Sequence, residues 1–505
     1  MHIHYNTNQT TLPLEISSFL PQDHLVFTIE KVVNTLEDSH FHAFYHAFGR
    51  PSYHPKMLVS ALLFAYSQGI FSGRKIEKMM IENLAMQYLT GQLLVSYRTI
   101  NRFRVDEGLI RNLFIDLNLR LKMEELVTLD CLFIDGTKIE ANANKYSFVW
   151  KKATEKFSAK LQEQIQVYFQ EEITPLIHQA IKLDEEEPIS SEQLLAFAQV
   201  LEEELEKLNQ DIEETPVKGK DERKTQRRKL KKVLRKVKDD FSVRTEKYES
   251  YQETFEGRNS FSKTDPDATF MRMKEDHMKN GQLKAAYNLQ IATENQFVLH
   301  YDIFSNPTDT KTLLPFLETY PHELKTVVAD AGYGSEENLL RLDENKVNHL
   351  IKYAMFDKEQ KRGYKQSARN LGNWHYDNKE DSYTHPDGWC YRFHHIKHQK
   401  TQTDFQQEIK VYYADEPESA PQKGLYMNER YQHLKTKECQ ALLSPKGRQI
   451  FAQRKIDVEP VFGQIKACLG YKRCNLRGKR QVRIDMGLVL MANNLLKYNK
   501  RTTQN

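Results

Sequence analysis

The sequence has few cysteines and no long apolar run. Its five cysteines are scattered over 505 residues without regular spacing, which argues against a disulfide framework and indicates a reducing compartment. No uninterrupted apolar stretch approaches the roughly 20 residues that a membrane-spanning helix needs. The first residues lack the basic and apolar regions of a signal peptide. We therefore expect a soluble, cytoplasmic protein without a membrane partner.

The chain also has little net charge, although its charges are unevenly distributed. The formal net charge of +4 excludes no class of protein by itself. The C-terminal region is nevertheless basic, with Lys466, Lys472, Arg473, Arg477, Lys479, Arg480 and Arg483. Such a cluster is commonly a solvated surface, but beside a carboxylate site it favours nucleic acid as a partner.

Two short apolar segments that end in an aspartate form the most informative pattern. The first, residues 129–138, contains Asp135, and the second, residues 326–334, contains Asp330. A short, nearly continuous apolar run bounded by glycine is typical of a central strand that is buried on both faces. A carboxylate at the end of such a strand is partly desolvated, so its charge needs a partner such as a cation.

A third carboxylate, Glu459, lies in a basic segment near the C-terminus. Oxygen ligands suit Mg²⁺ or Mn²⁺, so Asp135, Asp330 and Glu459 together predict a metal site. Two ions roughly 4 Å apart can activate a water or a 3′-hydroxyl and stabilise the leaving oxygen of a phosphodiester. Lys466, seven residues after Glu459 and two helical turns along, and Arg454 are expected to contact DNA phosphates. The alternative for each aspartate is a turn or cap residue.

Residues 1–123 predict a helical domain that binds DNA. Ser96 is a suitable N-cap for a short helix over 97–104, in which Ile100 and Phe103 can face a core. The remaining side chains can meet base edges or phosphates, as in the recognition helix of a helix-turn-helix: Arg98, Asn101, Arg102 and Arg104. An ordinary exposed helix with basic residues is the alternative.

A long polar segment, residues 146–265, interrupts the sheet pattern. Its acidic part includes 184–187 and 202–206, and its basic part, 227–238, keeps an apolar seam of Leu230, Val233, Leu234 and Val237. These patterns predict a helical hairpin in which an acidic arm lies against a basic arm. We favour charge pairing within the hairpin, and the alternative is that the basic arm binds DNA phosphates.

The sheet pattern resumes at 266–357, where strands and helices follow one another in an order that indicates a mixed sheet with helices on its faces. The last segment, 446–505, is predicted to be helical and to pack onto the sheet. We therefore expect a catalytic domain that consists of 124–145, 266–357 and 446–505.

A second insertion, residues 358–445, is poor in aliphatic side chains. It contains four residues that suit zinc: Cys390, His394, His395 and His398. Their spacing matches no ordinary zinc site, however, and favours a solvated loop or strand.

At these residues the chain resembles the D-D-E transposases of insertion sequences. Segments similar to the helical region of that family lie at 54–58, 72–77 and 99–104, and segments similar to the blocks around its first two catalytic aspartates lie at 133–142, 287–290 and 329–333. The third block of the family has the order Tyr, two residues, Arg, three residues, Glu, six residues, Lys. Glu459 and Lys466 keep this spacing, whereas Phe451 stands where Tyr is usual and the Arg role falls to Arg454 or Lys455.

The resemblance implies a ribonuclease-H-like catalytic fold. The expected α/β architecture is a mixed sheet with helices on both faces, joined to an N-terminal all-α helix-turn-helix domain and interrupted by the helical hairpin. The catalytic metal ligands would be Asp135, Asp330 and Glu459, with Mg²⁺ or Mn²⁺ as cofactor. The implied DNA contacts include Arg454, Lys455, Lys466, Lys472 and Arg473.

The implied reaction is cleavage and strand transfer at the ends of a bacterial insertion sequence. Its partners would be double-stranded DNA, as element ends and as target, and further copies of the chain in a homodimer or larger multimer. Two alternatives remain open: a metal-dependent DNA nuclease without strand transfer, and a non-catalytic DNA-binding regulator.

Overall fold

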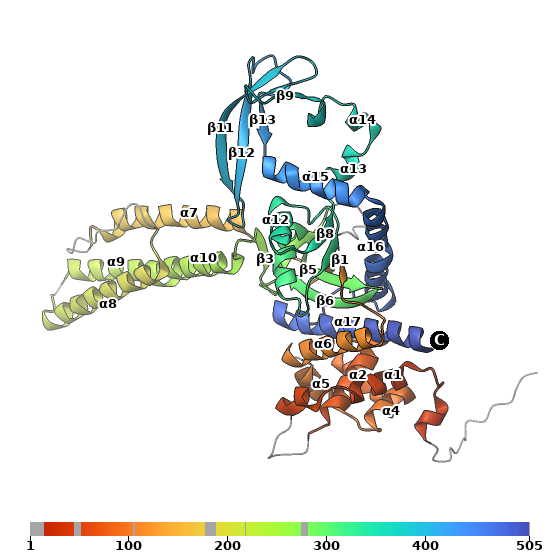
Figure 1. The fold of residues 1–505 in the computed structure, drawn as a ribbon. Helices are drawn as coiled ribbons and strands as arrows, with labels where there is room; N and C mark the ends of the chain where they lie inside the picture. Colours follow the sequence, from red (N-terminus) through yellow and green to blue (C-terminus); the bar gives the residue numbers. More distant parts are fainter. Residues whose placement is uncertain are drawn as a thin grey trace, which may run out of the picture. The chain divides into compact units, whose positions relative to one another are not determined.

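The computed structural model describes residues 15–44, 52–104, 107–176, 188–217, 219–273 and 281–503. The chain divides into two compact units (Figure 1): Met1–Asn142 with Ala286–Asn505, and Ala143–Ala285. The acidic stretch 184–187 lies outside the described residues. Within the described ranges, every helix falls short of the length or apolar character that a bilayer span requires.

The larger unit begins with a group of helices, as predicted for the N-terminal region. They are α1 (Leu25–Asn34), α2 (Pro55–Ser67), α3 (Gly73–Glu82), α4 (Leu84–Thr90), α5 (Tyr97–Phe103) and α6 (Glu107–Met123). Pro55 occupies the first turn of α2, where its missing N–H leaves no hydrogen bond unmade. The Ser96 side chain accepts a hydrogen bond from the Arg98 N–H and so caps α5.

The predicted mixed sheet follows. Its strands in this unit are β1 (Cys131–Glu140), β5 (Leu283–Glu294), β6 (Phe297–Phe304), β7 (Thr326–Ala329) and β8 (Asn348–Ile351). They are ordered β6-β5-β1-β7-β8, with β1 antiparallel to β5 and parallel to β7. Most residues of β1, β5 and β7 are buried. In β1 and β5 these include polar residues, among them Asp135, Asn288 and Gln290.

Helices cover the sheet, as predicted. They are α11 (Leu313–Glu318), α12 (Glu336–Glu344), α15 (Glu429–Leu443), α16 (Pro445–Gly463) and α17 (Lys479–Thr503). α16 packs on β1 and β7, whereas α17 packs on β6, α2 and α6. Edge strands leave backbone groups unpaired, and on β6 the buried Asn494 side chain bonds both the N–H and the C=O of Val298. α17 therefore joins the N-terminal helices to the sheet.

The insertion before α15 forms a separate antiparallel sheet within the larger unit. Short helices α13 (Phe356–Glu359) and α14 (Arg362–Lys365) precede β9 (His375–Asp377), β10 (Ser382–Thr384), β11 (Cys390–Lys400), β12 (Gln406–Ala414) and β13 (Gly424–Met427). The strands are ordered β13-β12-β11-β10-β9. His394, His395 and His398 lie along β11 and are exposed, as expected for a solvated strand.

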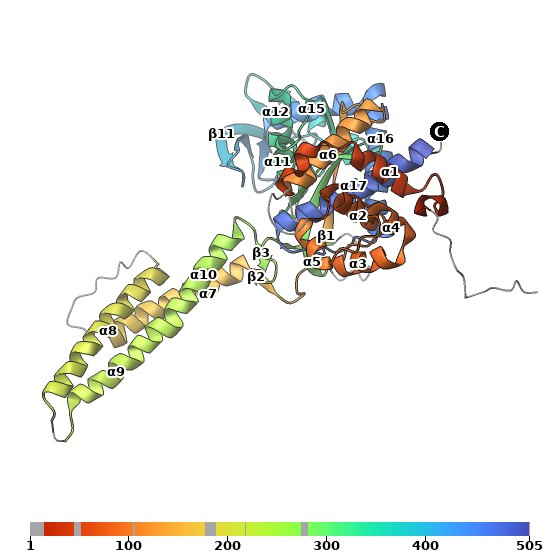
Figure 2. The same ribbon diagram turned by 90° about the horizontal axis from the view of Figure 1, so that it is seen from below.

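The smaller unit contains the predicted hairpin, extended to four helices (Figure 2). Its elements are β2 (Phe148–Trp150), α7 (Lys151–Tyr168), α8 (Ser191–Glu214), α9 (Glu222–Lys236), α10 (Ser242–Phe255), β3 (Ser260–Ser262) and β4 (Thr269–Arg272). One apolar core joins the helices, and it includes Leu161, Ile165, Leu194, Leu201, Leu230 and Val233. Ser190 and Gln193 form a capping box that fixes the start of α8.

Candidate active site

Asp135 lies in the middle of β1 and not at its end, as was expected, because the strand continues to Glu140. The residue is almost fully buried. Its Oδ1 accepts a hydrogen bond from the Gly136 N–H at 2.8 Å, and its Oδ2 lies 3.2 Å from Arg454 Nη1 on α16. The Asp135 side chain is 12% exposed and the Arg454 side chain 9% exposed. Because a buried carboxylate needs a countercharge, the Arg454 guanidinium neutralises Asp135 in this arrangement. The contact is an ion pair without hydrogen-bond geometry.

Asp330 directly follows β7, the strand that lies parallel to β1. The register of the two strands ends at Phe133 and Val328, two residues before Asp135 and Asp330. The Asp330 Oδ1 accepts a hydrogen bond from the Gly332 N–H at 2.8 Å, which fixes the turn after β7.

A further carboxylate, Asp309, lies beside this pair and was not predicted. Its Oδ1 accepts hydrogen bonds from Asn288 Nδ2 at 2.7 Å and from Gln290 Nε2 at 2.8 Å. A Cβ atom at Gly136 would lie 2.8 Å from that Oδ1, and a Cβ at Gly332 would lie 3.5 Å from Asp309 Oδ2 and 3.0 Å from Asp330 Oδ1. The two glycines, which follow Asp135 and Asp330 closely in sequence, thus leave room for Asp309.

Tyr333 lies within electrostatic reach of these three carboxylates. Its side chain is fully buried, and its hydroxyl donates a hydrogen bond to Gln290 Oε1. Burial raises the pKa of the Tyr333 phenol well above its usual value, and the negative charges of Asp309, Asp135 and Asp330 raise it further. Tyr333 therefore stays protonated and orients the Gln290 amide toward Asp309.

α16 carries the third predicted carboxylate on a different face from Arg454. Glu459 and Lys455 are exposed, whereas Arg454 and Asp457 are buried. Five residues separate Arg454 from Glu459, a rotation of roughly 140° and a rise of about 7.5 Å. The structure therefore brings Asp135 and Arg454 together and places Glu459 on the exposed side of the helix that packs on β1.

Pro460 lies inside a helix, where proline is uncommon. α16 runs through it from Pro445 to Gly463. A proline in a helix leaves the carbonyl four residues earlier without its usual donor, and here the Ile456 carbonyl accepts a hydrogen bond from Gln296 Nε2 at 2.9 Å. The Gln296 N–H also bonds Asp457 Oδ1 at 2.9 Å. The turn between β5 and β6 thus supports the helix at the proline.

Three of the predicted DNA contacts lie at the carboxyl end of β1. Lys466 Nζ donates a hydrogen bond to the Lys138 carbonyl at 3.0 Å. Lys472 and Arg473 are exposed, and their backbone pairs with Glu140, since the Glu140 N–H bonds the Lys472 carbonyl at 3.3 Å. Lys466 itself lies in a π-helical turn over Gln464–Cys468, so the regular two-turn spacing from Glu459 does not hold.

The four predicted DNA-binding residues around α5 do not share one surface. Arg98 and Arg102 are exposed, and Arg98 stacks on Tyr97. Asn101 is half-buried, and its side chain packs against Gly73 on α3. Arg104 is buried and donates a hydrogen bond to the Phe71 carbonyl at 2.7 Å. Arg104 therefore supports the helical domain from inside, which corrects its assignment to the exposed side.

The carboxylates near β1 and β7 suit a hard cation, whereas Glu459, the third predicted ligand, lies apart from them on the exposed side of α16. Asp135, Asp330 and Asp309 offer carboxylate oxygens, the ligands that Mg²⁺ and Mn²⁺ prefer. Across the described ranges, no three His, Cys, Asp or Glu side chains are grouped closely enough to hold a metal ion. Arg454 occupies the position beside Asp135 that a cation would take.

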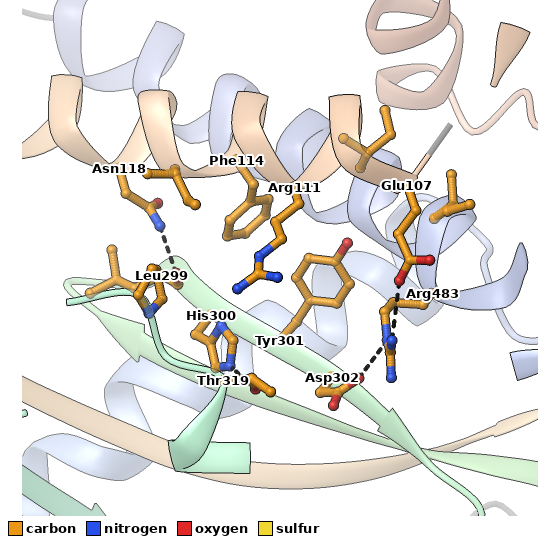
Figure 3. Close-up of a pocket in the computed structure, with 14 residues that line it drawn as sticks. Glu107, Arg111, Phe114, Asn118, Leu299, His300, Tyr301, Asp302, Thr319 and Arg483 are labelled. Carbon is orange, nitrogen blue, oxygen red and sulfur yellow. Dashed lines mark hydrogen bonds and ion pairs between the residues drawn. The ribbon is translucent and has the colours of Figure 1, made fainter. Parts of the chain in front are cut away.

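A cavity of about 120 Å³ lies elsewhere in the larger unit, between α6, β6 and the first turn of α17 (Figure 3). Arg111 points into it between Phe114 and Tyr301. His300 lines it, and burial lowers the pKa of that imidazole to about 4. At its rim Arg483 bonds Asp302 at 2.7 Å and Glu107 at 3.1 Å. None of the predicted catalytic residues lines this cavity.

Two family models match the chain. The model described as Transposase DDE domain matches residues 260–495, and the model described as Transposase domain (DUF772) matches residues 14–106. Together they cover well over half of the chain, including Asp330 and Glu459, while Asp135 falls between them. No curated protein matches the chain.

Proposed function

The chain belongs to the insertion-sequence transposases of the D-D-E type, and on this premise we propose that it catalyses metal-dependent cleavage and strand transfer at the ends of a bacterial insertion sequence. The observation that carries this proposal is that the parallel register of β1 and β7 ends two residues before Asp135 and Asp330. Asp330 follows the end of β7, and in α/β sheets sites form at such strand ends. We propose that the protein acts in the bacterial cytoplasm.

Asp135 and Asp330 would hold a divalent cation, Mg²⁺ or Mn²⁺, with Glu459 as the third ligand. When bound, such an ion supplies Lewis-acid stabilisation of a phosphodiester and activation of a water or a 3′-hydroxyl. The side-chain amides of Asn288 and Gln290 donate hydrogen bonds to Asp309 and fix the position of its carboxylate. Arg454 supports Asp135, because its guanidinium neutralises a carboxylate that is otherwise buried without a countercharge.

The remaining proposed contacts are with DNA. Lys466, Lys472 and Arg473 lie past Asp135 along β1, where cations can bind the phosphates of a strand that enters the site. Lys455 is exposed on α16 and is a further candidate. In the helical domain, Arg98 and Arg102 are the exposed pair, and Asn101 is half-buried between them. The proposed assembly on paired DNA ends is a homodimer or a larger multimer.

The test compares Asp135→Asn with Asp130→Asn. Asp130 is an exposed carboxylate one residue before β1 that pairs with Lys325 at 2.7 Å, so its variant removes the same charge outside the site. The substrate is a linear duplex that carries the DNA flanking the coding region. We expect Mg²⁺-dependent nicking by the native protein and by Asp130→Asn. In Asp135→Asn the nicking rate should fall by a factor on the order of a thousand.

DNA binding provides the control for this experiment. Asp135→Asn removes a negative charge beside the proposed DNA path, so binding should be kept or improved. Equal nicking by Asp135→Asn and the native protein would exclude the proposed catalytic role. Persistent DNA binding without nicking by any form would favour the non-catalytic regulator.

A further inference from the structure

The smaller unit presents an exposed row of cations on α9. Lys224, Arg228, Lys231, Lys232 and Arg235 are all exposed, and we call them the α9 basic face. Their spacings of four, three, one and three residues place them within an arc of roughly 100° around the helix. They span twelve residues, whose eleven steps extend about 16 Å along the helix axis.

Packing fixes the direction in which this face points. Leu230 and Val233 lie on the opposite side of α9 and are buried in the core of the smaller unit, together with Leu194 and Leu201 of α8. Figure 2 shows α8 and α9 lying side by side. Because the apolar seam is held in that core, the α9 basic face is turned toward solvent and cannot rotate to meet α8.

The acidic arm does not neutralise this face, contrary to the charge pairing expected within the hairpin. α8 carries eight acidic residues and one lysine, yet the described ion pair that links it to the basic arm is Lys238 with Glu202 at 2.6 Å, beyond the end of α9. Within the described ranges, Arg228, Lys231 and Lys232 make no ion pair or hydrogen bond.

The two ends of the face have only weak partners. Arg235 lies 3.9 Å from Asp239, and their side chains are 85% and 67% exposed. Lys224 interacts electrostatically with Asp221, but that carboxylate already forms an ion pair with Arg223 at 3.1 Å. Like charges three and four residues apart on a helix repel each other. The face is thus a concentrated, uncompensated positive charge.

The chemistry of the face indicates what it binds. α9 contains no aromatic residue, so it offers no platform for stacking on unpaired bases. Lysine and arginine side chains in a row suit phosphate oxygens, which position DNA without reading its sequence. One strand of a duplex presents a phosphate about every 3.4 Å along its axis, so the length of the face corresponds to roughly five phosphates.

We propose that the α9 basic face is a second DNA-binding surface, which holds the phosphate backbone of double-stranded DNA independently of sequence. This inference rests on the proposed function, because that function supplies DNA as the polyanion. The surface belongs to the smaller unit and uses none of the residues proposed for catalysis. Its contribution is therefore to affinity for DNA of any sequence.

The experiment uses the full-length protein and two triple variants with equal change in net charge. The first, Arg228→Gln with Lys231→Gln and Lys232→Gln, removes the centre of the face. The second, Lys152→Gln with Lys156→Gln and Lys160→Gln, removes three exposed lysines of α7 in the same unit. Affinity for a fluorescent duplex of arbitrary sequence is measured by anisotropy, without divalent metal, over a series of KCl concentrations.

We expect the first variant to bind at least about tenfold more weakly at low salt. The slope of log affinity against log salt should become shallower by about 2.7, since each lost phosphate contact removes roughly 0.9. The α7 variant should keep the native slope. A slope and an affinity for the α9 variant equal to those of the α7 variant would overturn the proposal, because the effect would then be one of net charge alone.

Three further measurements separate the possible failures. Thermal unfolding shows whether the α9 variant is folded, and an Arg228→Lys, Lys231→Arg and Lys232→Arg variant should restore native binding because it restores the charges. Metal-dependent nicking at saturating DNA should be unchanged in the α9 variant. Loss of the proposed function would appear as absent nicking in the native protein, whatever the binding data show.

Discussion

The basic C-terminal region and the α9 basic face have similar compositions but use their charges differently. In the C-terminal region Arg483 bonds Asp302 and Glu107. Within the described part of α9, Arg228, Lys231 and Lys232 have no such partner. A cation whose charge is already satisfied holds the fold together, whereas an unsatisfied cation is available to a ligand. Amino-acid composition alone does not distinguish cations paired within the fold from cations available to a ligand, whereas the following variants do.

The largest contrast is expected between two neighbours on α16. Arg454→Gln leaves the buried Asp135 without its countercharge, so we expect a loss of stability of about 3 kcal/mol and a strong loss of nicking. Lys455→Gln changes an exposed cation and should alter stability by less than about 0.5 kcal/mol. Chemical denaturation of both variants provides the measurement. Equal stability of the two variants would contradict the structural role of Arg454.

A second contrast lies at the end of α5. Arg104 is buried against Phe71 and Tyr66, so Arg104→Gln should lower stability by roughly 2 kcal/mol because the Phe71 carbonyl loses its donor. Arg102 is exposed, and Arg102→Gln should instead weaken DNA binding while the melting temperature stays the same. If Arg104→Gln instead weakened only DNA binding, Arg104 would be a DNA-binding residue and not a structural one.

A smaller effect is expected for Arg483, whose side chain is 33% exposed. Arg483→Gln leaves Glu107 and Asp302 without their cation, and solvent screening limits the loss of stability to about 1 kcal/mol. Arg228→Gln on α9 should cost no stability. Paired denaturation curves test the contrast directly, and destabilisation by Arg228→Gln would show that its charge is satisfied within the fold.

The smallest effect concerns a cation whose charge depends on pH. Burial alone would lower the pKa of His349, but hydrogen bonds with Glu438 and Asp343 outweigh burial and raise it. The protonated imidazole should therefore stabilise the protein fully below pH about 6.5, and this contribution should be lost as the pH rises through the raised pKa. As the pH rises, the melting temperature of the native protein should fall toward that of His349→Gln. The difference that is lost should be a few degrees at most. An advantage that grows with pH would refute this sign.

The sequence predicted the features that depend on local pattern. The apolar run before Asp330 became β7, and the run before Asp135 became the first half of β1, which continues to Glu140. The N-cap at Ser96 also followed from local chemistry. The recognition of the hairpin from its apolar seam was sound for the same reason.

What the sequence did not reveal depends on contacts between distant segments. Helix α16 passes through Pro460 because Gln296, far away in sequence, bonds the Ile456 carbonyl. Asp309 sits beside the aspartates because Asn288 and Gln290 donate to it from β5. The Asn288 and Gln290 pair, two residues apart and on one face of a buried strand, was the signal that could have indicated a nearby carboxylate. The direction of Arg104 was likewise decided by packing.

The central claim is that Asp135 and Asp330 act as a pair in joining DNA ends. It is tested most directly by strand transfer, in which a labelled duplex end with a free 3′-hydroxyl is incubated with plasmid target and Mg²⁺. We expect the native protein and Asp130→Asn to form the joined product, and Asp135→Asn and Asp330→Asn to form none while still binding the labelled end. Joined product at native yield from Asp330→Asn would contradict the claim.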